Sequence, residues 1–439
     1  MSYMPPRETG TGVDAFGMQH ATRVPAALAA FGQAAEAIAA CSLDAMPALQ
    51  RALAADPDMP AAQALQGLSM LLSGRAEPMA AARALWRSLP DSAETADEAA
   101  LRAAFGAAAR RGPLAAAAVL DAHLVRRPEL LLFVKLATSL RFMGGDARGM
   151  LATTAQVMPA WSAATPGFGY VLGCHAFALE EAGEYAAAER AGRRAVELAP
   201  HDAWAVHAVA HVHEMTHRPA EGEAWIEAQR PGWRNCNSFT YHLSWHLALF
   251  HLDQGRTGRV LELYDTEIRP DRSEEYRDFA NAVALLWRLR QHGVDVGGRW
   301  DELAAIARRR RAETELVFAA LHRLLALLAV GDLASARETA AALAAAAEGE
   351  DEQSQVAARV GAGLAGALVA AAESATPIPL AGLSEKLHLI GGSHAQRDVF
   401  VRSLALLAER RGDRAALADL LAARRRLKRD DRFLDLLAA

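Results

Sequence analysis

LGCHAFALEEAGEYAAAERAGRRAVELAP, residues 172–200, is the stretch that decides the fold. It contains two segments rich in Ala, Leu, Arg and Glu, which favour helix, separated at Gly183 and ended by Pro200. Small residues at Ala176 and Ala195 stand where two helices of a hairpin approach closely. This arrangement is typical of a tetratricopeptide repeat, a pair of helices about 34 residues long.

The same pattern continues along the chain on both sides of this stretch. Gly, Pro and Asp breaks separate the amphipathic segments through the middle of the chain, and small residues recur in steps of 34 at Ala176, Ala210 and Ser244. No stretch alternates convincingly as a strand. The sequence therefore predicts an all-α fold of tetratricopeptide-like helical hairpins that form a superhelical solenoid.

This reading divides the chain into four parts. Residues 1–20 are expected to form an N-terminal arm, 21–160 degenerate helical repeats, 161–347 tetratricopeptide-like repeats with a histidine-rich concave site, and 348–439 C-terminal helical repeats. The last part contains the loop GGSHAQRD, residues 391–398.

Composition excludes several classes of protein. The balance of 47 Lys and Arg against 52 Asp and Glu gives no basic footprint for nucleic acid. Three cysteines without a C-x-x-C pair argue against a disulfide framework. The N-terminus lacks an apolar signal region, and no apolar run reaches the roughly 18 residues of a membrane span. We expect a cytoplasmic protein with no membrane or nucleic-acid partner, and an oligomer stays open.

Two His-x-x-x-His motifs are the candidate functional feature. His207 and His211 are followed 35 residues later by His242 and His246, so the two pairs occupy equivalent positions on consecutive repeats. Residues at i, i+4 and i+7 share one face of a helix, which adds Glu214 to the first pair. A further 35 residues along the chain come Arg277 and Asn281, and Trp204 and Trp245 are expected as apolar walls of the same groove.

Four imidazoles on one concave surface have several chemical uses. His207, His211, His242 and His246 could bind a divalent metal, zinc or iron, because neutral imidazole is a common ligand for both. With Glu214 they are also the candidate catalytic residues, one His acting as a general base while Arg277 clamps a carboxylate or phosphate. The motif His-Ala-Val-Ala-His lacks the Glu of zincin proteases. In the structural alternative, the histidines hydrogen-bond across helices and only fix their register.

The loop 391–398 is the second candidate. Gly391, Gly392 and Ser393 predict a helix start whose amides could bind an anion with help from Arg397. In the alternative, the helix is simply capped and its polar side chains tie the C-terminal repeats together. The candidate ligand-binding residues here are His394, Gln396, Arg397 and Asp398. His213, His217 and His251 are assigned to surface or packing roles. His322, which shares a helix face with Glu315, is a weaker third candidate, and the alternative for it is ordinary packing.

Several segments resemble the tetratricopeptide repeat protein 38 family. The resemblance is carried by GYVLG (169–173), HAFALEE (175–181), DAWAVHAVAHV (202–212), EM (214–215), YHLSWHLALF (241–250), LLWRL (285–289) and the loop 391–398. It covers most of the chain after about Pro159. It implies an all-α repeat fold, usually cytoplasmic, and supplies the fold more than a biochemical activity. The family often has Asp-x-His near Ala320 to His322 and a His near Gln63, and both features differ here.

Three functions remain open at this point. The first is a protein that binds a small molecule in a histidine-rich pocket, with or without a metal, and catalyses a reaction on it. The second is an interaction scaffold that binds a peptide or helix in an open groove, without converging histidines. The third is a structural or regulatory partner of an enzyme, in which each imidazole is buried and internally bonded.

Overall fold

The computed structural model describes residues 11–90, 95–429 and 431–437, and these residues are almost entirely helical. The predicted all-α class is confirmed. One exception was not predicted: β1 (Gly12–Val13) and β2 (Gln19–His20) form a small antiparallel hairpin. Strands of two residues are too short to show an alternating pattern in sequence. The hairpin belongs to the predicted N-terminal arm, of which residues 1–10 lie outside the described residues.

Proline and capping residues set where many of the helices in the first part of the chain begin. Proline occupies the first turn of three of them, where its missing N–H is not needed. Thr95 and Glu98 form a capping box at the start of another. The helices are α1 (Pro25–Ala39), α2 (Ala45–Ala55), α3 (Pro60–Leu71), α4 (Ala76–Ser88), α5 (Ala96–Arg110), α6 (Pro113–Leu124), α7 (Leu131–Met143) and α8 (Ala147–Val157).

The middle of the chain forms consecutive helix pairs, and small residues let them pack closely. Gly192 shows why: a Cβ there would lie 2.6 Å from Cγ2 of Val209, so α10 and α11 could not approach as they do. The helices are α9 (Phe168–Glu181), α10 (Tyr185–Leu198), α11 (Ala203–Met215), α12 (Pro219–Trp233), α13 (Phe239–Asp253), α14 (Thr257–Leu263), α15 (Tyr276–Gln291), α16 (Trp300–Arg309), α17 (Val317–Ala329) and α18 (Leu333–Ala346).

The last part of the chain continues with α19 (Glu352–Val356), α20 (Ala362–Ala372), α21 (Leu383–Lys386), α22 (His394–Arg410) and α23 (Arg414–Arg425). A π-helical turn at Ala357–Gly361 joins α19 to α20, so that residues 352–372 form one helical run. By length and composition this run alone, among the described residues, could cross a membrane, which the sequence analysis did not anticipate. Half of the apolar 18-residue window within this run is buried inside the protein.

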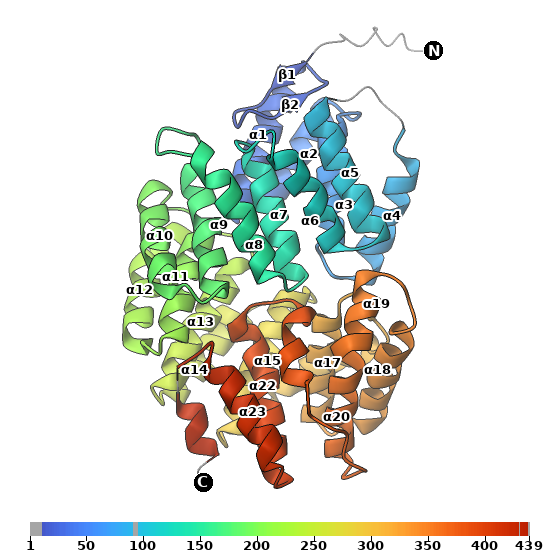
Figure 1. Cartoon of the computed structure of the whole chain (residues 1–439), viewed down its shortest axis with the longest axis vertical. Helices are drawn as coiled ribbons and strands as arrows, with labels where there is room; N and C mark the ends of the chain where they lie inside the picture. The colour runs from blue at the N-terminus through green and yellow to red at the C-terminus, as the bar shows by residue number, and fades with distance from the viewer. Residues whose placement is uncertain (1–10, 91–94, 430, 438–439) are drawn as a thin grey trace.

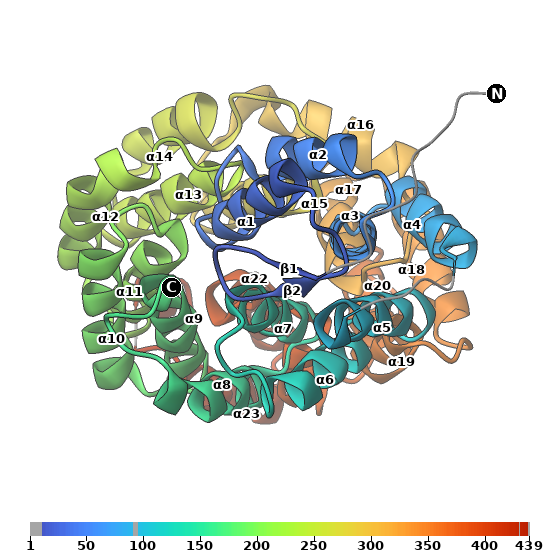
Figure 2. The same ribbon diagram turned by 90° about the horizontal axis from the view of Figure 1, so that it is seen from above.

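The helices follow one another around a ring that passes beneath its own beginning. Seen from above, α1 to α9 run around the ring, α10 to α14 complete the circuit, and α15 to α23 lie under the first helices (Figure 2). In the side view the N-terminal helices form an upper layer and the C-terminal helices a lower layer (Figure 1). Helices α11, α13 and α15 lie on the inner side of the ring, whereas α10, α12, α14 and α16 lie outside (Figure 2).

Specific hydrogen bonds connect the two layers. The carboxylate of Glu352 in the lower layer accepts hydrogen bonds from the backbone amides of Leu114 and Ala115, both at 2.8 Å, and so caps the start of α6. The turn after α1 is bonded to the turn before α13 by the amide of Asn237, which donates to the carbonyl of Cys41 at 2.7 Å. These contacts close the ring around its centre.

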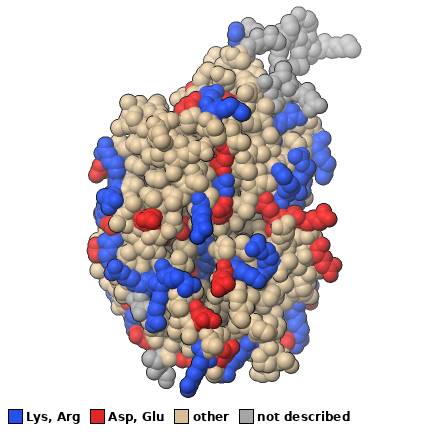
Figure 3. Space-filling model, viewed as in Figure 1, with Lys and Arg blue, Asp and Glu red and all other residues tan. Residues whose placement is uncertain are grey.

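Charged side chains of both signs are interspersed on the face shown in Figure 3. Surface ion pairs are frequent among the described residues, for example Arg309 with Glu274 at 2.6 Å. Exposed pairs of this kind contribute little stability individually. The functionally interesting charges lie inside the ring.

Candidate metal centre

Four histidines converge on the inner side of the ring. His207 and His211 lie one turn apart on α11, and His242 and His246 lie one turn apart on α13. Their exposed fractions are 1%, 0%, 7% and 0%. One ring nitrogen from each lies within 4.8 Å of those of the other three. We call these four residues the histidine cluster. The 35-residue spacing of the two motifs in the sequence places them on neighbouring helices and so brings them together.

Two of the four rings have a fixed proton position. Nδ1 of His246 lies 3.0 Å from Oε2 of Glu214, and Nδ1 of His242 lies 3.1 Å from Oδ1 of Asn281. Both partner atoms are acceptors, so in each ring Nδ1 carries the proton and donates it outward. A neutral imidazole has one N–H, and the Nε2 atoms of both rings therefore present lone pairs.

These lone pairs face one another. Nε2 of His242 lies 3.3 Å from Nε2 of His246 and 2.9 Å from Nε2 of His207. A proton on Nε2 of His207 can lie only between His207 and His242. The Nε2 atoms of His242 and His246 therefore have no proton between them. Four nitrogens at roughly 2.0–2.1 Å from a zinc ion would be separated by roughly 3.3 Å. The two Nε2 distances from His242 are close to that value, and all four nitrogens lie within 4.8 Å of one another. The arrangement fits a cation bound among the nitrogens.

His207 and His211 supply nitrogens without hydrogen-bond partners. Among the described residues, Nδ1 of His207 and both ring nitrogens of His211 are buried and unbonded. Oε2 of Glu180 lies 3.5 Å from Nδ1 of His211, and both of its carboxyl oxygens are also unbonded. An unpaired buried polar atom costs about 1–3 kcal/mol. Internal bonding, which the structural alternative requires of every imidazole, is therefore incomplete in this cluster.

Burial keeps the four rings neutral, which is the form that binds a metal. Burial, followed by the proximity of the other histidines, lowers the pKa of His207 and His242 well below the ordinary value. Burial also lowers the pKa of His211, and that of His246 to about 4. At neutral pH the cluster thus presents lone pairs rather than positive charges.

A carboxylate and a lysine stand behind the cluster. Burial would raise the pKa of Glu214, but Lys428 and the hydrogen bond from His246 bring that pKa well below its ordinary value. Nζ of Lys428 donates to Oε1 of Glu214 at 3.1 Å, while Oε2 accepts from His246. A carboxylate that accepts from the far nitrogen of a histidine orients the ring and strengthens it as a metal ligand. Glu214 is placed for this role and does not line the cavity described next.

A cavity of about 380 Å³ adjoins the cluster on one side. His207 and His242 belong to its wall, whereas His211 and His246 do not, so two of the four imidazoles face the cavity. We call it the central cavity. Its wall is apolar in large part and is formed by side chains of α7, α11, α13, α15 and α22, among them Lys135, Trp204, Phe239, Asp278, Asn281 and Gln396. Its volume is that of a small-molecule pocket.

The predicted wall and clamp residues have different positions in the structure. Trp204 lines the central cavity, but Trp245 is buried behind His242, stacked on its ring at 5.3 Å between centroids. Arg277 also lines the cavity, but its guanidinium is paired with Glu275 at 2.8 Å. Asn281 lines the cavity as well, and its oxygen is used to hold His242.

The second predicted candidate, the start of α22, is occupied by the protein itself. Ser393 and Gln396 form a capping box, and the amide of His394 donates to Oε1 of Glu181 at 2.9 Å. Arg397 pairs with Glu181 at 3.2 Å, and Asp398 pairs with Arg424 elsewhere. An acidic side chain of α9 thus takes the place of an external anion. Of the four predicted residues, only Gln396 lines the central cavity.

The remaining histidines lie apart from the cluster. Nδ1 of His322 is bonded to the carbonyl of Phe318 at 2.8 Å, which agrees with the packing alternative. His213 lies beside Arg193, 3.4 Å from its guanidinium. His217 is half-buried and His251 is buried, and neither lines the central cavity.

Sequence reasoning missed two charged residues of the central cavity. Lys135 comes from α7 and Asp278 from the first turn of α15. Burial, with the neighbouring Glu275, raises the pKa of Asp278 to about 7, so this carboxyl group can both release and accept a proton at neutral pH. Asp278 precedes Asn281 by three residues and so shares its helix face, which is a signal that the sequence did contain. Nothing near Lys135 in the sequence pointed to the cluster.

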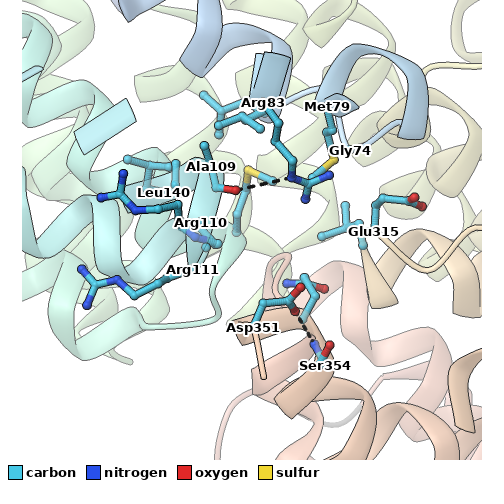
Figure 4. A pocket seen from close by; sticks show the side chains of 18 of the residues that line it. Gly74, Met79, Arg83, Ala109, Arg110, Arg111, Leu140, Glu315, Asp351 and Ser354 are labelled. Atoms are coloured by element: carbon cyan, nitrogen blue, oxygen red, sulfur yellow. Dashed lines mark hydrogen bonds between the residues drawn. The ribbon is translucent and has the colours of Figure 1, made fainter. Parts of the chain in front are cut away.

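A second cavity, of about 400 Å³, adjoins the central one between the two layers. Leu72, Met143 and Leu316 line both cavities and separate them. We call this space the interlayer cavity. In Figure 4 Arg83 extends into it from the upper layer, and Glu315 lies across from Arg83.

No protein-family model matches the chain, so the function of the site is inferred from its geometry.

Proposed function

We propose that this chain is a metal-dependent protein that binds a small molecule in the central cavity, beside a single divalent metal ion held by the histidine cluster. The proposal includes tetratricopeptide-like repeats wound into a superhelix as the scaffold. The segments that resemble the tetratricopeptide repeat protein 38 family are also those that carry the four histidines.

One observation carries this proposal. The Nδ1 atoms of His242 and His246 are directed at acceptors outside the cluster, while their Nε2 atoms face each other at 3.3 Å. Hydrogen bonds across helices, such as those of His246 with Glu214 and of His242 with Asn281, would fix helix register without bringing two unprotonated Nε2 atoms face to face. A bound cation gives every inward lone pair a partner, and metal-ligating histidines commonly donate their other N–H outward in this way.

The ligand set restricts the metal. Imidazole suits zinc, iron, copper and nickel, and of these we infer zinc or iron. Four histidines complete the tetrahedral shell of zinc, which is the coordination of a structural site. Iron accepts more than four ligands, which would leave a position toward the cavity beside His207 and His242. Coordination number therefore distinguishes a structural centre from a reactive one.

A reactive centre would have its acid or base at hand. A metal bound here supplies Lewis-acid polarisation to a ligand in the cavity. Asp278, whose pKa is raised to about 7, would exchange a proton with that ligand at a carboxyl oxygen. Trp204 and Phe239 would exclude water from its apolar part. The scaffold alternative has no comparable observation behind it, because the four histidines are buried rather than presented along an open groove.

Elemental analysis tests this proposal. Untagged protein is compared with a His207→Ala/His242→Ala variant and with His322→Ala, a buried histidine outside the cluster, as the matched control. We expect about one equivalent of zinc or iron in the wild type and the control, and none in the double variant. Circular dichroism verifies that each variant is folded. A wild-type protein that holds no metal after reconstitution with zinc or with ferrous iron would overturn the proposal.

A further inference from the structure

Lys135 is a buried cation that lines the central cavity without an acidic partner. Its exposed fraction is 6%. Among the described residues, no carboxylate oxygen comes within 4.0 Å of its Nζ, which donates a long hydrogen bond to Sγ of Cys41 at 4.0 Å. The ammonium instead lies over the ring of Trp204, 4.6 Å from its centroid. Lysine is almost never fully buried unless it is paired with a counterion.

The lysine nonetheless stays charged. Burial lowers the pKa of Lys135, but the neighbouring Cys41, Cys174 and Asp202 raise it, so that the net change is upward. Burial also raises the pKa of Asp202 to about 7, and this carboxyl group spends part of its hydrogen-bonding capacity on the amide of Trp204 at 3.0 Å, at the start of α11. The charge on Lys135 is therefore only partly compensated from within the protein.

The position of Lys135 relates it to the histidine cluster. The ring of Trp204 contacts the ammonium of Lys135 and lies 5.1 Å from the ring of His207, between centroids. A ligand held by the ammonium would thus extend along Trp204 toward the two imidazoles that face the cavity. The other cation of the wall, Arg277, is already paired with Glu275.

We propose that Lys135 is the anion-binding residue of the central cavity, and that the ligand is a small monocarboxylate with an apolar or aromatic body. The single unpaired cation selects one negative charge rather than the two of a phosphate monoester. Aromatic side chains of the wall, Trp204, Phe239 and Phe318, suit an apolar body. This inference deepens the proposed small-molecule site and rests on it, but Lys135 itself is not a metal ligand.

Calorimetric titration with a matched set of probes tests the inference. Phenylacetate, its neutral amide phenylacetamide and phenyl phosphate are titrated into wild-type protein, both metal-loaded and metal-free. We expect phenylacetate to bind at least tenfold more tightly than the other two in both forms. Equal binding of phenylacetate and its amide, tighter binding of phenyl phosphate, or binding of none of the three would overturn the inference.

Two variants assign the preference to the residue. Lys135→Met removes the charge at similar length, and Lys386→Met makes the same change at an exposed lysine outside the central cavity. The preference should disappear in the first variant and persist in the second, with metal content unchanged in both. A preference retained in Lys135→Met, or a loss of metal from it, would contradict the assignment. Carboxylate preference in a wild type that binds no metal would leave this inference standing while the metal centre failed.

Discussion

Two groups of buried histidines among the residues that the structure describes are built in opposite ways. At the N-terminal hairpin, His20 lies 3.1 Å from Asp14 and His123 lies 2.7 Å from Asp97, so each imidazole faces a carboxylate. In the histidine cluster the acceptors stand outside and the imidazoles face one another. The first arrangement pairs each imidazole with a carboxylate, and Asp97 also accepts a hydrogen bond from the backbone amide of Gln19, which joins the hairpin to α5. The second leaves inward lone pairs, and this difference separates a structural network from a ligand site.

The largest difference between the two histidine groups is expected in how metal binding changes the free energy of unfolding. With free metal about 1,000-fold above its dissociation constant, binding should add about 4 kcal/mol to the free energy of unfolding of the wild type. His246→Gln should lose this increment, whereas His20→Gln should keep all of it, because His20 binds no metal. Chemical denaturation with and without a chelator measures both. An equal loss in the two variants would erase the distinction between the groups.

The second prediction is that the two groups respond to pH with opposite signs. Burial lowers the pKa of His20, but Asp14 and Glu98 raise it further, so its net pKa is above 6.5. Its stabilising contribution is fully present below pH 6.5 and is lost as the pH rises through the raised pKa. The pKa of His246 is lowered to about 4, so its contribution is present above pH 6.5 and is lost as the pH falls toward 4.

Hydrogen exchange, corrected for the intrinsic rates, resolves the two regions. Between pH 7.5 and pH 5.5, protection should increase at residues 12–20 and decrease in α11 and α13. His20→Gln should abolish the increase in protection at residues 12–20 and leave the decrease in α11 and α13 in place. Changes of the same sign in both regions would mean that the pKa values of His20 and His246 are shifted in the same direction, which would contradict this prediction.

A third prediction concerns the acceptor behind the cluster. Glu214→Gln keeps the shape of the side chain but removes the charge that orients His246, and metal affinity should fall by about 10- to 100-fold. Glu223→Gln on α12, which removes a carboxylate bonded to Gln254 at the surface, is the control and should leave metal affinity unchanged. Competition with a metal-binding dye measures the dissociation constants. Affinity unchanged in Glu214→Gln would deny that carboxylate a role in the centre.

The smallest effect is expected at Glu180. Its oxygen is 3.5 Å from His211, compared with 3.0 Å between Glu214 and His246, and it lacks the lysine that supports Glu214. Glu180→Gln should therefore weaken metal binding by less than about tenfold. The same dye competition ranks the two variants. A larger loss at Glu180 than at Glu214 would reverse the assignment of the outer acceptors.

Local patterns in the sequence were sufficient for the helical class and for the centre of the site. The recurrence of histidines after 35 residues placed two i, i+4 pairs on neighbouring inner helices, and Asn281 followed by the same spacing. Helix periodicity predicted that Trp204 and Trp245 point about 60° away from the histidines on their helices. It could not predict whether a side chain pointing in that direction reaches the cavity or the core. Trp204 meets the cavity, and Trp245 is buried.

The rest of the site depends on the closure of the ring. Lys135 on α7, Gln396 on α22 and Lys428 after α23 reach the centre because the second layer passes under the first (Figures 1 and 2). No repeat spacing relates these residues to the histidines. The loop 391–398 was correctly expected to start a helix, but the carboxylate that occupies that start, Glu181, comes from more than 200 residues earlier.

X-ray absorption spectroscopy of the metal-loaded protein reports the atoms bound to the metal, and therefore tests whether the histidine cluster is the metal centre. We predict a first shell with four imidazole nitrogens, at about 2.0–2.1 Å if the metal is zinc, and the loss of that shell in His207→Ala/His242→Ala. Oxygen ligands beside the four nitrogens would indicate a reactive centre open to the central cavity. A shell dominated by oxygen or sulfur, with fewer than three imidazoles, would contradict the claim that the histidine cluster is the metal centre.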